Sequence, residues 1–370
     1  MHIERIRLEH FRNIQTLEIK PNQGVNLIVG ENASGKTNFC EAIYYTAQGR
    51  LLKGKRQREL INWEENYTRI EIETEKDHIK LVLDRESQMK RVEVNYQSVS
   101  TTGDMDRYLR SFIFVPDELQ IIKGSPQGRR RFLNRSITAL DREYSYYLEK
   151  YRKELSRKNA LLKKERIDHR LLEVLNESLV ETGSRLLHRR VHYLNELNDR
   201  LPQIYERLMR KKGTLRLKYL CSLDEPYQDL NIGIGMNEIR ERYATRIEAV
   251  KAEERERHFS LVGPHRDDLR FIWDGVDMER YGSQGQQKLF IISIKVAQVE
   301  LIQEQFTDSP ILIIDDVISE FDQNRAKLLI ENLPTNGQVF LTHTEVNDLL
   351  QRLDGDIYYM IDGRMTHGHR

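Results

Sequence analysis

Few cysteines and no long apolar run limit what this chain can be. Only Cys40 and Cys221 occur among its 370 residues, which is too few for a disulfide framework or a cysteine-based metal site. Apolar runs such as Ile311–Ile314 fall far short of the roughly 20 residues that a membrane-spanning helix needs. The first residues show no apolar signal core. We therefore expect a cytoplasmic protein with reduced thiols and no membrane association.

A dominant charge is also missing. The chain has 59 basic and 58 acidic residues, a net charge of +1, so its overall charge gives no reason to expect nucleic acid as a partner. The distribution is less even, because residues 123–170 contain 15 Lys or Arg but only 6 Asp or Glu. Apolar residues make up 39% and charged residues 32% of the chain, which is typical of a soluble protein with one large or two ordinary domains.

The character of the sequence changes twice along the chain. Strand patterns fill most of the first third, and strands and helices return in the last third. Between them, from Ser125 to about Arg210, Leu, Arg, Lys and Glu dominate and breakers are few, which predicts three or four long helices. The simplest architecture is an α/β head built from both chain ends, residues 1–122 and 257–370, with an α-helical arm of residues 123–256 inserted between them.

A glycine-rich segment follows the apolar strand pattern at Val25–Val29. Residues 30–37 read Gly-Glu-Asn-Ala-Ser-Gly-Lys-Thr and satisfy the phosphate-loop pattern G-x-x-x-x-G-K-[ST], with a helix pattern directly behind them. Glycines let the backbone close around phosphate oxygens, and N–H groups at the helix start favour an anion. We expect Lys36 to reach the β and γ phosphates of ATP and Thr37 to bind Mg²⁺. The expected ATP ligands of this loop are Gly30, Glu31, Asn32, Ala33, Ser34, Gly35, Lys36 and Thr37.

A second apolar strand pattern ends in two carboxylates. Residues 311–316 read Ile-Leu-Ile-Ile-Asp-Asp, and apolar residues on both faces predict a strand buried in a parallel sheet. Ligands of α/β proteins bind at the carboxyl ends of such strands. We expect Asp315 to hold the Mg²⁺ and Asp316 to polarise the water that attacks the γ-phosphate.

A polar segment before the next long helix pattern is similar to the signature sequence of ABC ATPases. Residues 283–287 read Ser-Gln-Gly-Gln-Gln. In ABC ATPases the serine and glycine of the signature contact the γ-phosphate of an ATP molecule held by the other subunit. Gln284 stands where the usual signature has its first glycine. The resemblance implies that Ser283, Gly285 and Gln286 bind ATP.

Two shorter segments agree with this class. Residues 319–322, Ser-Glu-Phe-Asp, follow the carboxylate strand as the D-loop does in ABC ATPases. His343 follows the strand pattern at residues 338–341, where the class carries a switch histidine near the γ-phosphate. The expected catalytic residues are therefore Lys36, Asp316 and His343.

The order of these segments resembles the RecF/SMC group of ABC ATPases, and within it the RecF branch. Residues 8–13, Leu-Glu-His-Phe-Arg-Asn, are similar to the first turn of that group, whose basic residue lies near the nucleotide, and Arg12 is the corresponding residue here. The segments that carry the resemblance to the RecF branch are 114–119, 123–126, 129–133, 261–269 and 283–287.

The resemblance implies a function in recombinational repair and in the processing of replication gaps. Members of the RecF branch bind DNA, especially duplex beside a gap, when ATP dimerises them. They help to load the recombinase onto single-stranded gaps, with RecO and RecR as partners. Most ABC ATPases have glutamate where this chain has Asp316, and the shorter side chain fits a weak, DNA-stimulated ATPase that acts as a switch. No glutamine stands at the expected place in the Q-loop region after Val115, where Glu118 and Asp117 are the alternatives.

The basic segment at residues 123–170 has a physical rationale for binding DNA, because arginines and lysines along a helix neutralise phosphates and release counterions. The alternative is a solvated helix face with intrahelical ion pairs such as Glu149–Lys153. Some of the arginines could instead face the ATP site or brace the head. The expected DNA contacts are Arg129, Arg130, Arg131, Arg135, Lys153, Arg157 and Lys164.

Two other interpretations share these motifs. An ABC transporter ATPase subunit has the same loop and strand, but the long helical insertion between them argues against it. An SMC-like structural DNA clamp that binds ATP without significant turnover is the second, and phosphate release with and without DNA distinguishes it from an ATPase.

Overall fold

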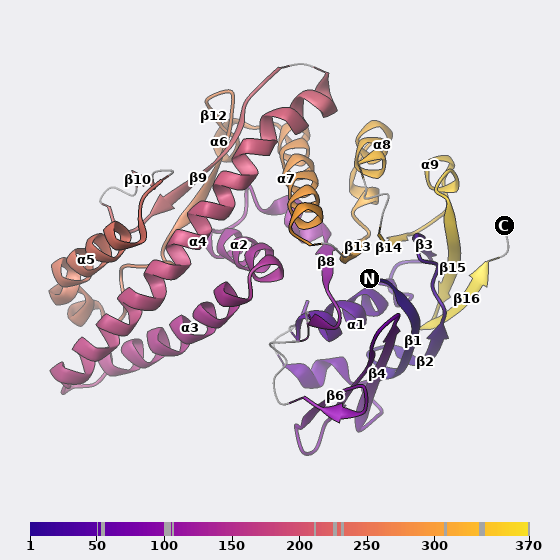
Figure 1. Ribbon diagram of the computed structural model, residues 1–370, viewed down its shortest axis with the longest axis horizontal. Helices are drawn as coiled ribbons and strands as arrows, with labels where there is room; N and C mark the ends of the chain where they lie inside the picture. Colours follow the sequence, from indigo (N-terminus) through magenta and orange to yellow (C-terminus); the bar gives the residue numbers. More distant parts are fainter. Residues whose placement is uncertain are drawn as a thin grey trace. The chain divides into compact units, whose positions relative to one another are not determined.

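The protein consists of two compact units in the computed structural model (Figure 1). The structure describes residues 1–49, 51–52, 56–99, 105, 107–210, 212–224, 228–230, 233–306, 309–332 and 337–368. We call Met1–Glu118 together with Val299–Arg370 the head unit, and Leu119–Gln298 the arm unit. Both ends of the chain thus build one unit, and the segment between them builds the other.

The arm unit is longer than the segment assigned to it from the sequence. Residues 257–298, which the sequence places in the head, belong to the arm unit. The reason is a strand pairing, since β11 (Asp268–Trp273) pairs antiparallel with β9 (Leu215–Cys221) along its whole length. A strand of the predicted C-terminal head segment therefore completes a sheet that begins inside the insertion.

The core sheet of the head unit has the strand order β16-β15-β3-β14-β13-β8. Its strands are β3 (Val25–Val29), β8 (Ser111–Phe114), β13 (Ile311–Asp315), β14 (Val339–His343), β15 (Gly355–Ile361) and β16 (Arg364–Gly368). All neighbouring pairs except β15 and β16 are parallel. The apolar runs of the sequence become buried strands because both faces of a parallel sheet are covered. The carboxyl ends of β3, β13 and β14 consequently lie at one edge of the sheet.

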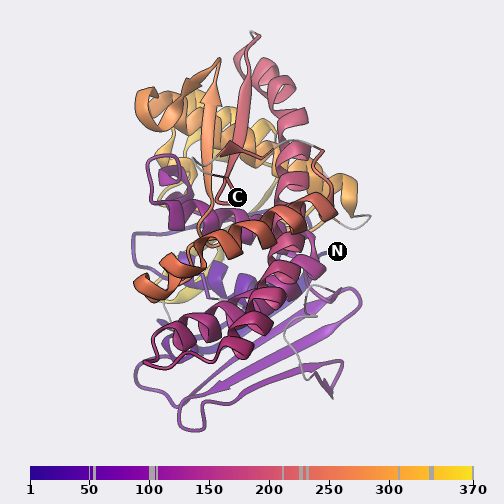
Figure 2. The ribbon, with the colours of Figure 1, turned by 90° about the vertical axis from the view of Figure 1, so that its left-hand side faces the viewer.

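A second sheet of the head unit is antiparallel, with the order β2-β1-β4-β5-β6-β7, and Figure 2 shows its long purple strands side by side. Its strands are β1 (Ile3–Phe11), β2 (Ile14–Ile19), β4 (Tyr67–Thr74), β5 (His78–Asp84), β6 (Lys90–Val94) and β7 (Gln97–Ser98). Successive residues alternate between two faces. The apolar side chains of one face are buried in the core, while the other face carries ion pairs such as Arg5–Glu73 and Arg7–Glu18. This alternation is expected of a sheet with one solvated face.

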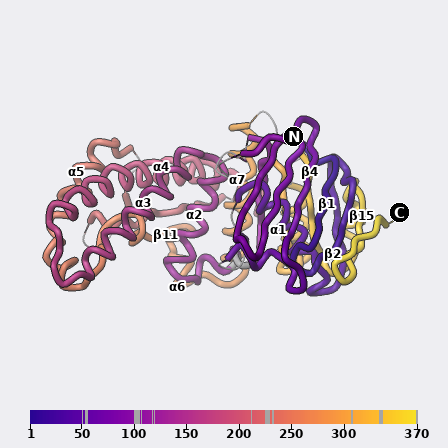
Figure 3. Tube along the Cα trace, turned by 90° about the horizontal axis from the view of Figure 1, so that it is seen from below, coloured from indigo at the N-terminus to yellow at the C-terminus, as the bar shows by residue number. Residues whose placement is uncertain are grey.

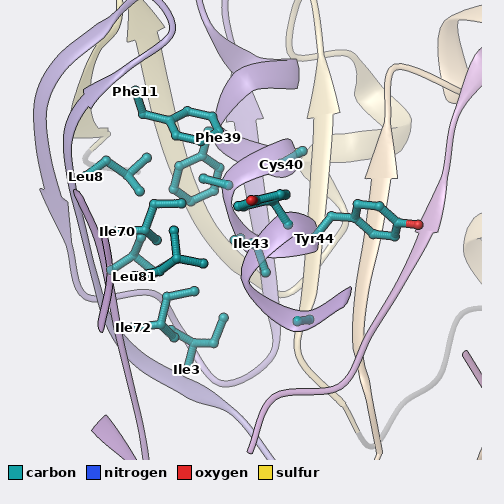
Figure 4. Close-up of a cluster of buried hydrophobic side chains, with 14 of the residues drawn as sticks. Ile3, Leu8, Phe11, Phe39, Cys40, Ile43, Tyr44, Ile70, Ile72 and Leu81 are labelled. Atoms are coloured by element: carbon teal, nitrogen blue, oxygen red, sulfur yellow. The ribbon is translucent and has the colours of Figure 1, made fainter. Parts of the chain in front are cut away.

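Helix α1 (Lys36–Gln48) is buried in an extended apolar cluster of the head unit. In Figure 4, Phe39 lies beside Phe11, and Leu8, Ile70 and Leu81 of the antiparallel sheet line the same core. Burial of a single such side chain contributes about 1.5–3 kcal/mol. The helix that follows the phosphate loop is thereby fixed against the strands around it.

The remaining elements of the head unit are short. They are η1 (Gln57–Leu60), η3 (Pro116–Gln120, which runs into the arm unit), η4 (Ile318–Glu320), α8 (Gln323–Glu331) and α9 (Asp348–Gln351). Asp322 caps α8, since its side chain accepts a hydrogen bond from the backbone N–H of Arg325 at 3.1 Å.

The arm unit is mainly helical, and both α3 and α5 pack against α4 (Figures 1 and 3). Its helices are α2 (Pro126–Leu140), α3 (Arg142–Leu162), α4 (His169–Met209), α5 (Met236–Arg257), α6 (Met278–Tyr281) and the start of α7 (Gln284–Gln305). Its sheet has the order β10-β9-β11-β12, where β10 is Gln228–Asp229 and β12 is Val276–Asp277. Ser125 caps α2, because its hydroxyl accepts a hydrogen bond from the Gly128 N–H at 3.2 Å.

Among the described residues, no helix has the length and apolar character that a membrane crossing requires. Cys40 and Cys221 are both buried and unpaired.

Candidate nucleotide site

The phosphate-loop segment connects β3 to α1 in a conformation that needs glycine at two places. A Cβ atom on Gly30 would lie 2.2 Å from the carbonyl oxygen of Met360. Gly35 has φ of 119°, in the left-handed region that side chains rarely adopt, and it directly precedes α1. Two backbone hydrogen bonds tie the loop down, from Gly30 N to His343 O at 3.3 Å and from Gly363 N to Ser34 O at 2.8 Å. The loop is therefore shaped before any ligand binds.

Lys36 places its ammonium group inside the loop. Its Nζ donates to the carbonyl oxygens of Gly30 at 2.6 Å and Glu31 at 2.9 Å. Burial lowers the pKa of Lys36, while the charges of Asp316 and Asp315 raise it. The loop thus holds a cation with carboxylates close to it, as the binding of a polyphosphate with a metal ion requires.

Asp315 receives two hydroxyl hydrogen bonds on one oxygen. Thr37 donates to Asp315 Oδ1 at 3.1 Å and Thr342 donates to the same atom at 2.9 Å. The backbone N–H of Asp316 in turn donates to the Thr342 hydroxyl at 2.9 Å. These four residues connect the ends of β13 and β14 to the start of α1.

Asp316 has an unusual backbone and an unsatisfied side chain. Its φ is 53°, and aspartate is one of the few residues other than glycine that visit this region. Its Oδ1 is buried and has no hydrogen-bond partner within the described structure. A buried acceptor without a partner is costly and calls for an explanation such as a bound water or ion. Strained backbone of this kind is frequent at functional sites.

The donors around Thr37 and Asp315 fit a magnesium ion. A hydroxyl and a carboxylate are the hard oxygen ligands that Mg²⁺ prefers, and they lie 3.1 Å apart. Among the described residues, His, Cys, Asp and Glu form no group of three that could hold a metal. Mg²⁺ takes one or two protein oxygens and completes its shell with water and phosphate.

His343 ends β14 and is buried. Its Nδ1 lies 2.8 Å from the carbonyl oxygen of Glu345 and 3.2 Å from the Glu345 nitrogen. In the sheet, His343 is opposite Val29, the last residue before the phosphate loop. The structure therefore brings the loop, both carboxylates and the histidine to one edge of the core sheet.

Arg12 and Asn13 form a turn beside the loop. Arg12 has φ of 50°, and its guanidinium binds the buried carboxylate of Glu41 in α1. Asn13 donates to the carbonyl oxygen of Ala33 at 3.2 Å and accepts from Asn38 at 2.7 Å. The sequence motif placed Arg12 near the nucleotide but gave no function to Asn13. Asn13 is the next residue of the same motif.

The signature-like segment begins α7 in the arm unit with reciprocal capping. The Gln286 N–H donates to the Ser283 hydroxyl at 3.3 Å, and the Ser283 N–H donates to Gln286 Oε1 at 2.9 Å. This is a capping box, in which the two side chains satisfy N–H groups at the helix start. Ser283 is exposed and Gly285 is half-buried. A helix N-terminus with its partial positive charge is thus open to solvent in the arm unit.

The structure argues against Arg129 as a DNA ligand. Its side chain is only 2% exposed and binds both carboxylate oxygens of Asp268 at 2.7 Å. A third contact reaches Glu279 at 3.3 Å. A bidentate pair of this kind leaves the guanidinium no face for a phosphate. Arg129 therefore braces the arm unit, and not the head as considered from the sequence.

The other expected DNA contacts fall into two groups, half-buried residues and exposed residues. Arg130 donates to the carbonyl oxygen of Asp267 at 2.7 Å, and Arg135 is half-buried. Arg157 forms an ion pair with Glu154 at 3.1 Å but remains 70% exposed. The exposed residues of the set are Arg131, Lys153, Arg157 and Lys164.

In the Q-loop region, the backbone N–H of Glu118 donates to Val115 O at 3.1 Å and the side chain is buried. The side chain of Asp117 lies outside the described part of the chain, so both alternatives stay predictions.

Fold and site define an ATPase head of the RecF/SMC class. The chain matches the RecF/RecN/SMC N terminal domain family over residues 2–355. Its fold is similar to that of the Smc head domain from Pyrococcus furiosus, with a TM-score of 0.56 at 17% identity, covering 99% of this chain and 96% of that one. This second likeness concerns the fold alone. The predicted fold class is confirmed.

The chain belongs to the RecF family of DNA replication and repair proteins. It is 38% identical to the DNA replication and repair protein RecF of Oceanobacillus iheyensis, over 94% of this chain and 95% of that protein. It is 35% identical to RecF of Halalkalibacterium halodurans, over 94% of both. A solved structure of the recombination mediator protein RecF with ATP in the RecFOR pathway has a TM-score of 0.87 at 30% identity, covering 100% of this chain and 98% of that one. The family predicted from the motifs is confirmed.

Proposed function

We propose that this protein is an ATP-dependent DNA-binding protein of recombinational repair and replication-gap processing, in which ATP drives dimerisation and slow hydrolysis reverses it. The observation that carries the proposal is the contact between Thr37 and Asp315, which unites the phosphate loop and the carboxylate strand at one edge of the sheet. Such a pair beside a loop lysine suits the binding of a nucleoside triphosphate. The similar solved structure of RecF with ATP supports ATP as the nucleotide.

ATP would be held by the phosphate loop of the head unit, residues 30–37, with its phosphates against Lys36 and the first N–H groups of α1. Arg12 would lie next to it, on the turn that Asn13 fastens to the loop through Ala33. Mg²⁺, when bound, would neutralise phosphate charge and hold the β and γ phosphates in place. Thr37 and Asp315 are the residues that would hold it.

Asp316 would orient the attacking water through its unpartnered carboxylate oxygen. His343, fixed by the Glu345 backbone, would contact the γ-phosphate. The aspartate side chain is one methylene shorter than the glutamate of most ABC ATPases and would hold the water less well. Slow turnover follows, which suits a switch that changes state once for each ATP hydrolysed.

The second half of the ATP site would come from another copy of the chain. Ser283 and Gly285 stand at the exposed start of α7, where a helix N-terminus attracts an anion. A second copy that presents this end to the γ-phosphate would complete the site, and a two-fold dimer would contain two such sites. Loss of the γ-phosphate removes the shared contact and releases the dimer.

DNA would bind through the exposed cations of the arm, among them Arg131, Lys153, Arg157 and Lys164. Such contacts are sequence-independent and weaken with salt. The RecFOR pathway named in the description of the similar RecF structure supports RecO and RecR as partners. Loading of the recombinase at gapped duplex is the step in which we place the protein.

Light scattering with ATP and with ADP tests the switch. The proposal requires a dimer with Mg-ATP and a monomer with ADP. DNA binding at increasing salt, on gapped and on plain duplex, tests the second half of the proposal. Equal mass in both nucleotide states would contradict the dimer switch. A dimer that forms with ATP yet releases no phosphate, with or without DNA, would instead favour a structural clamp without turnover.

A further inference from the structure

We propose that Thr342 is a positioning residue of the ATPase, whose single hydroxyl fixes both the metal-binding carboxylate of Asp315 and the backbone that presents Asp316. The inference rests on the proposed ATPase function. It concerns a residue to which the motifs give no role, since Thr342 lies inside β14, directly before the expected switch histidine.

The hydroxyl of Thr342 both donates and accepts a hydrogen bond inside the protein. It donates to Asp315 Oδ1 at 2.9 Å and accepts from the Asp316 N–H at 2.9 Å, and the side chain is 0% exposed. A hydroxyl has one proton to give, so its donor role is committed to Asp315. In the sheet register, Thr342 pairs with Asp315 on one side and with Ile28 of β3 on the other. Its position is therefore set by two parallel strands.

Two threonines donate to the same oxygen of Asp315 but differ in their freedom. Thr37 is an expected metal ligand, and its hydroxyl must serve the ion when the nucleotide binds. Thr342 has no such second task and keeps its bond to Asp315. Hydrogen bonds to a ligating carboxylate orient it, and their loss typically costs about 10–100-fold in metal affinity or activity.

The same hydroxyl, as a hydrogen-bond acceptor, fixes the backbone of Asp316. The Asp316 backbone has φ of 53°, a strained conformation that persists only when the surrounding structure imposes it. The Thr342 hydroxyl binds the N–H at the start of this strained residue. Without that acceptor, the partly buried N–H would lose its partner, and the turn would relax to a commoner conformation. The unpartnered Oδ1 of Asp316 would then move with it.

The experiment compares Thr342→Val, which keeps shape but removes the hydroxyl, with Thr342→Ser, which keeps the hydroxyl. Thr68→Val is the matched control, because Thr68 is equally buried in a strand and its hydroxyl binds the carbonyl oxygen of Glu9 at 2.9 Å. ATP binding is measured by calorimetry in EDTA and across a Mg²⁺ titration, and phosphate release and thermal unfolding are measured on the same samples.

We expect Thr342→Val to raise the half-saturating Mg²⁺ concentration for ATP binding about tenfold and to lower kcat by at least as much. ATP affinity in EDTA stays at the wild-type value, and Thr342→Ser and Thr68→Val keep the wild-type Mg²⁺ dependence. An unchanged Mg²⁺ dependence in Thr342→Val would overturn the inference. Thr342→Ala extends the test, and if both hydroxyl-free variants fail to fold, the hydroxyl serves folding alone and the inference also fails. Wild-type protein without Mg-dependent ATP binding would refute the proposed function itself, irrespective of these comparisons.

Discussion

The Thr37 hydroxyl donates to Asp315 across 3.1 Å, although 278 residues separate them in the chain. Parallel strands explain the meeting, since β3 and β13 flank β14 and all three end at the same edge of the sheet. Neither end of the chain contains the complete site. Metal-dependent nucleotide binding is therefore a measure of whether the two ends of the chain have assembled into the head unit.

Lys36→Met is expected to weaken ATP binding about ten- to hundredfold, because a hydrogen bond to a charged group contributes about 1.5–3 kcal/mol. The variant keeps the aliphatic length and loses the ammonium that lies between the carbonyls of Gly30 and Glu31. Calorimetric titration with ATP measures the effect. Lys20→Met, at an exposed lysine of the same unit, is the control and should bind ATP normally. Equal losses in both variants would show a general charge effect rather than a phosphate contact.

Asp316→Asn is expected to preserve ATP binding and lower phosphate release about 10²–10⁴-fold, the usual contribution of a positioned acid or base. Asparagine tolerates the same positive φ, so the backbone is retained while the acceptor charge is lost. Single-turnover phosphate release measures the rate. Asp362→Asn is the matched control, since Asp362 also has a positive φ, 47°, and is exposed. Full activity of Asp316→Asn would remove Asp316 from the catalytic residues.

Local patterns predicted the elements around the nucleotide site well. The helix pattern expected directly behind the phosphate loop is α1 (Lys36–Gln48), and the apolar run at residues 311–314 is β13 extended by Asp315. Both follow from signals within a few residues, namely a glycine loop before a helix and an uninterrupted apolar strand. Thr342 and Asn13 could not be found in this way, because their roles depend on hydrogen bonds to segments that the sequence does not place beside them.

The arm was harder to predict, and Arg129 shows why. In the sequence it is one of three consecutive arginines at the start of a helix, a pattern typical of a solvated basic face. Its partners Asp268 and Glu279 lie 139 and 150 residues further along the chain. Burial of a charge is decided by such distant partners, which periodicity does not reveal. The boundary of the arm also depends on a long-range contact. The pairing of β9 with β11 places residues after 257 in the arm unit, whereas the sequence predicted them in the head.

Substitution of Arg129 is expected to affect the stability of the protein, whereas substitution of Arg131 is expected to affect DNA binding. Arg129→Met should destabilise the protein by about 3–5 kcal/mol, because it leaves the Asp268 carboxylate without its partner. Arg131→Met, two residues along the same helix but exposed, should change stability by less than about 0.5 kcal/mol and should reduce the salt dependence of DNA binding. Urea unfolding and DNA binding across a salt series measure the two effects. The assignment is wrong if Arg131→Met unfolds like Arg129→Met.

Ser283→Arg is expected to prevent ATP-driven dimerisation while leaving ATP binding intact. The substitution places a bulky cation at the exposed start of α7, where the proposal puts the γ-phosphate of another copy, and it removes a cap worth about 1 kcal/mol. Ser283→Thr keeps the capping hydroxyl and serves as the control. Light scattering with Mg-ATP should give a monomer for the first variant and a dimer for the second. Dimerisation of Ser283→Arg at wild-type ATP concentrations would exclude this surface from the interface.

The stability of the arm unit is expected to depend on pH through His265. Its Nδ1 lies 2.6 Å from the Tyr151 hydroxyl and its Nε2 lies 3.2 Å from the carbonyl oxygen of Ser260, so the neutral ring accepts from one and donates to the other. Burial lowers the pKa of His265 to about 3, and the nearby charges of Arg266 and Lys158 act in the same direction.

An unfolded histidine has a pKa of about 6.5, so between about pH 3 and 6.5 the unfolded chain binds the proton that the folded chain refuses. Stability then falls as the pH falls through this window, by up to about 1.4 kcal/mol per pH unit. Asp267 has the opposite effect on stability, because burial raises its pKa. The folded chain keeps the Asp267 proton at a pH where the unfolded chain has lost it, so this contribution to stability rises as the pH falls. A comparison of variants separates the two contributions.

Urea unfolding of the wild type and of His265→Gln at pH 7.5, 6.5, 5.5 and 5.0 makes this comparison. Glutamine can still donate and accept hydrogen bonds but does not titrate. We expect His265→Gln to lose less stability than the wild type between pH 6.5 and 5.0, with the difference approaching about 1.4 kcal/mol per pH unit at the acidic end. His192→Gln, at a histidine that is 68% exposed, should follow the wild-type curve. Parallel curves for all three proteins would mean that His265 accepts a proton in the folded state and would contradict this prediction.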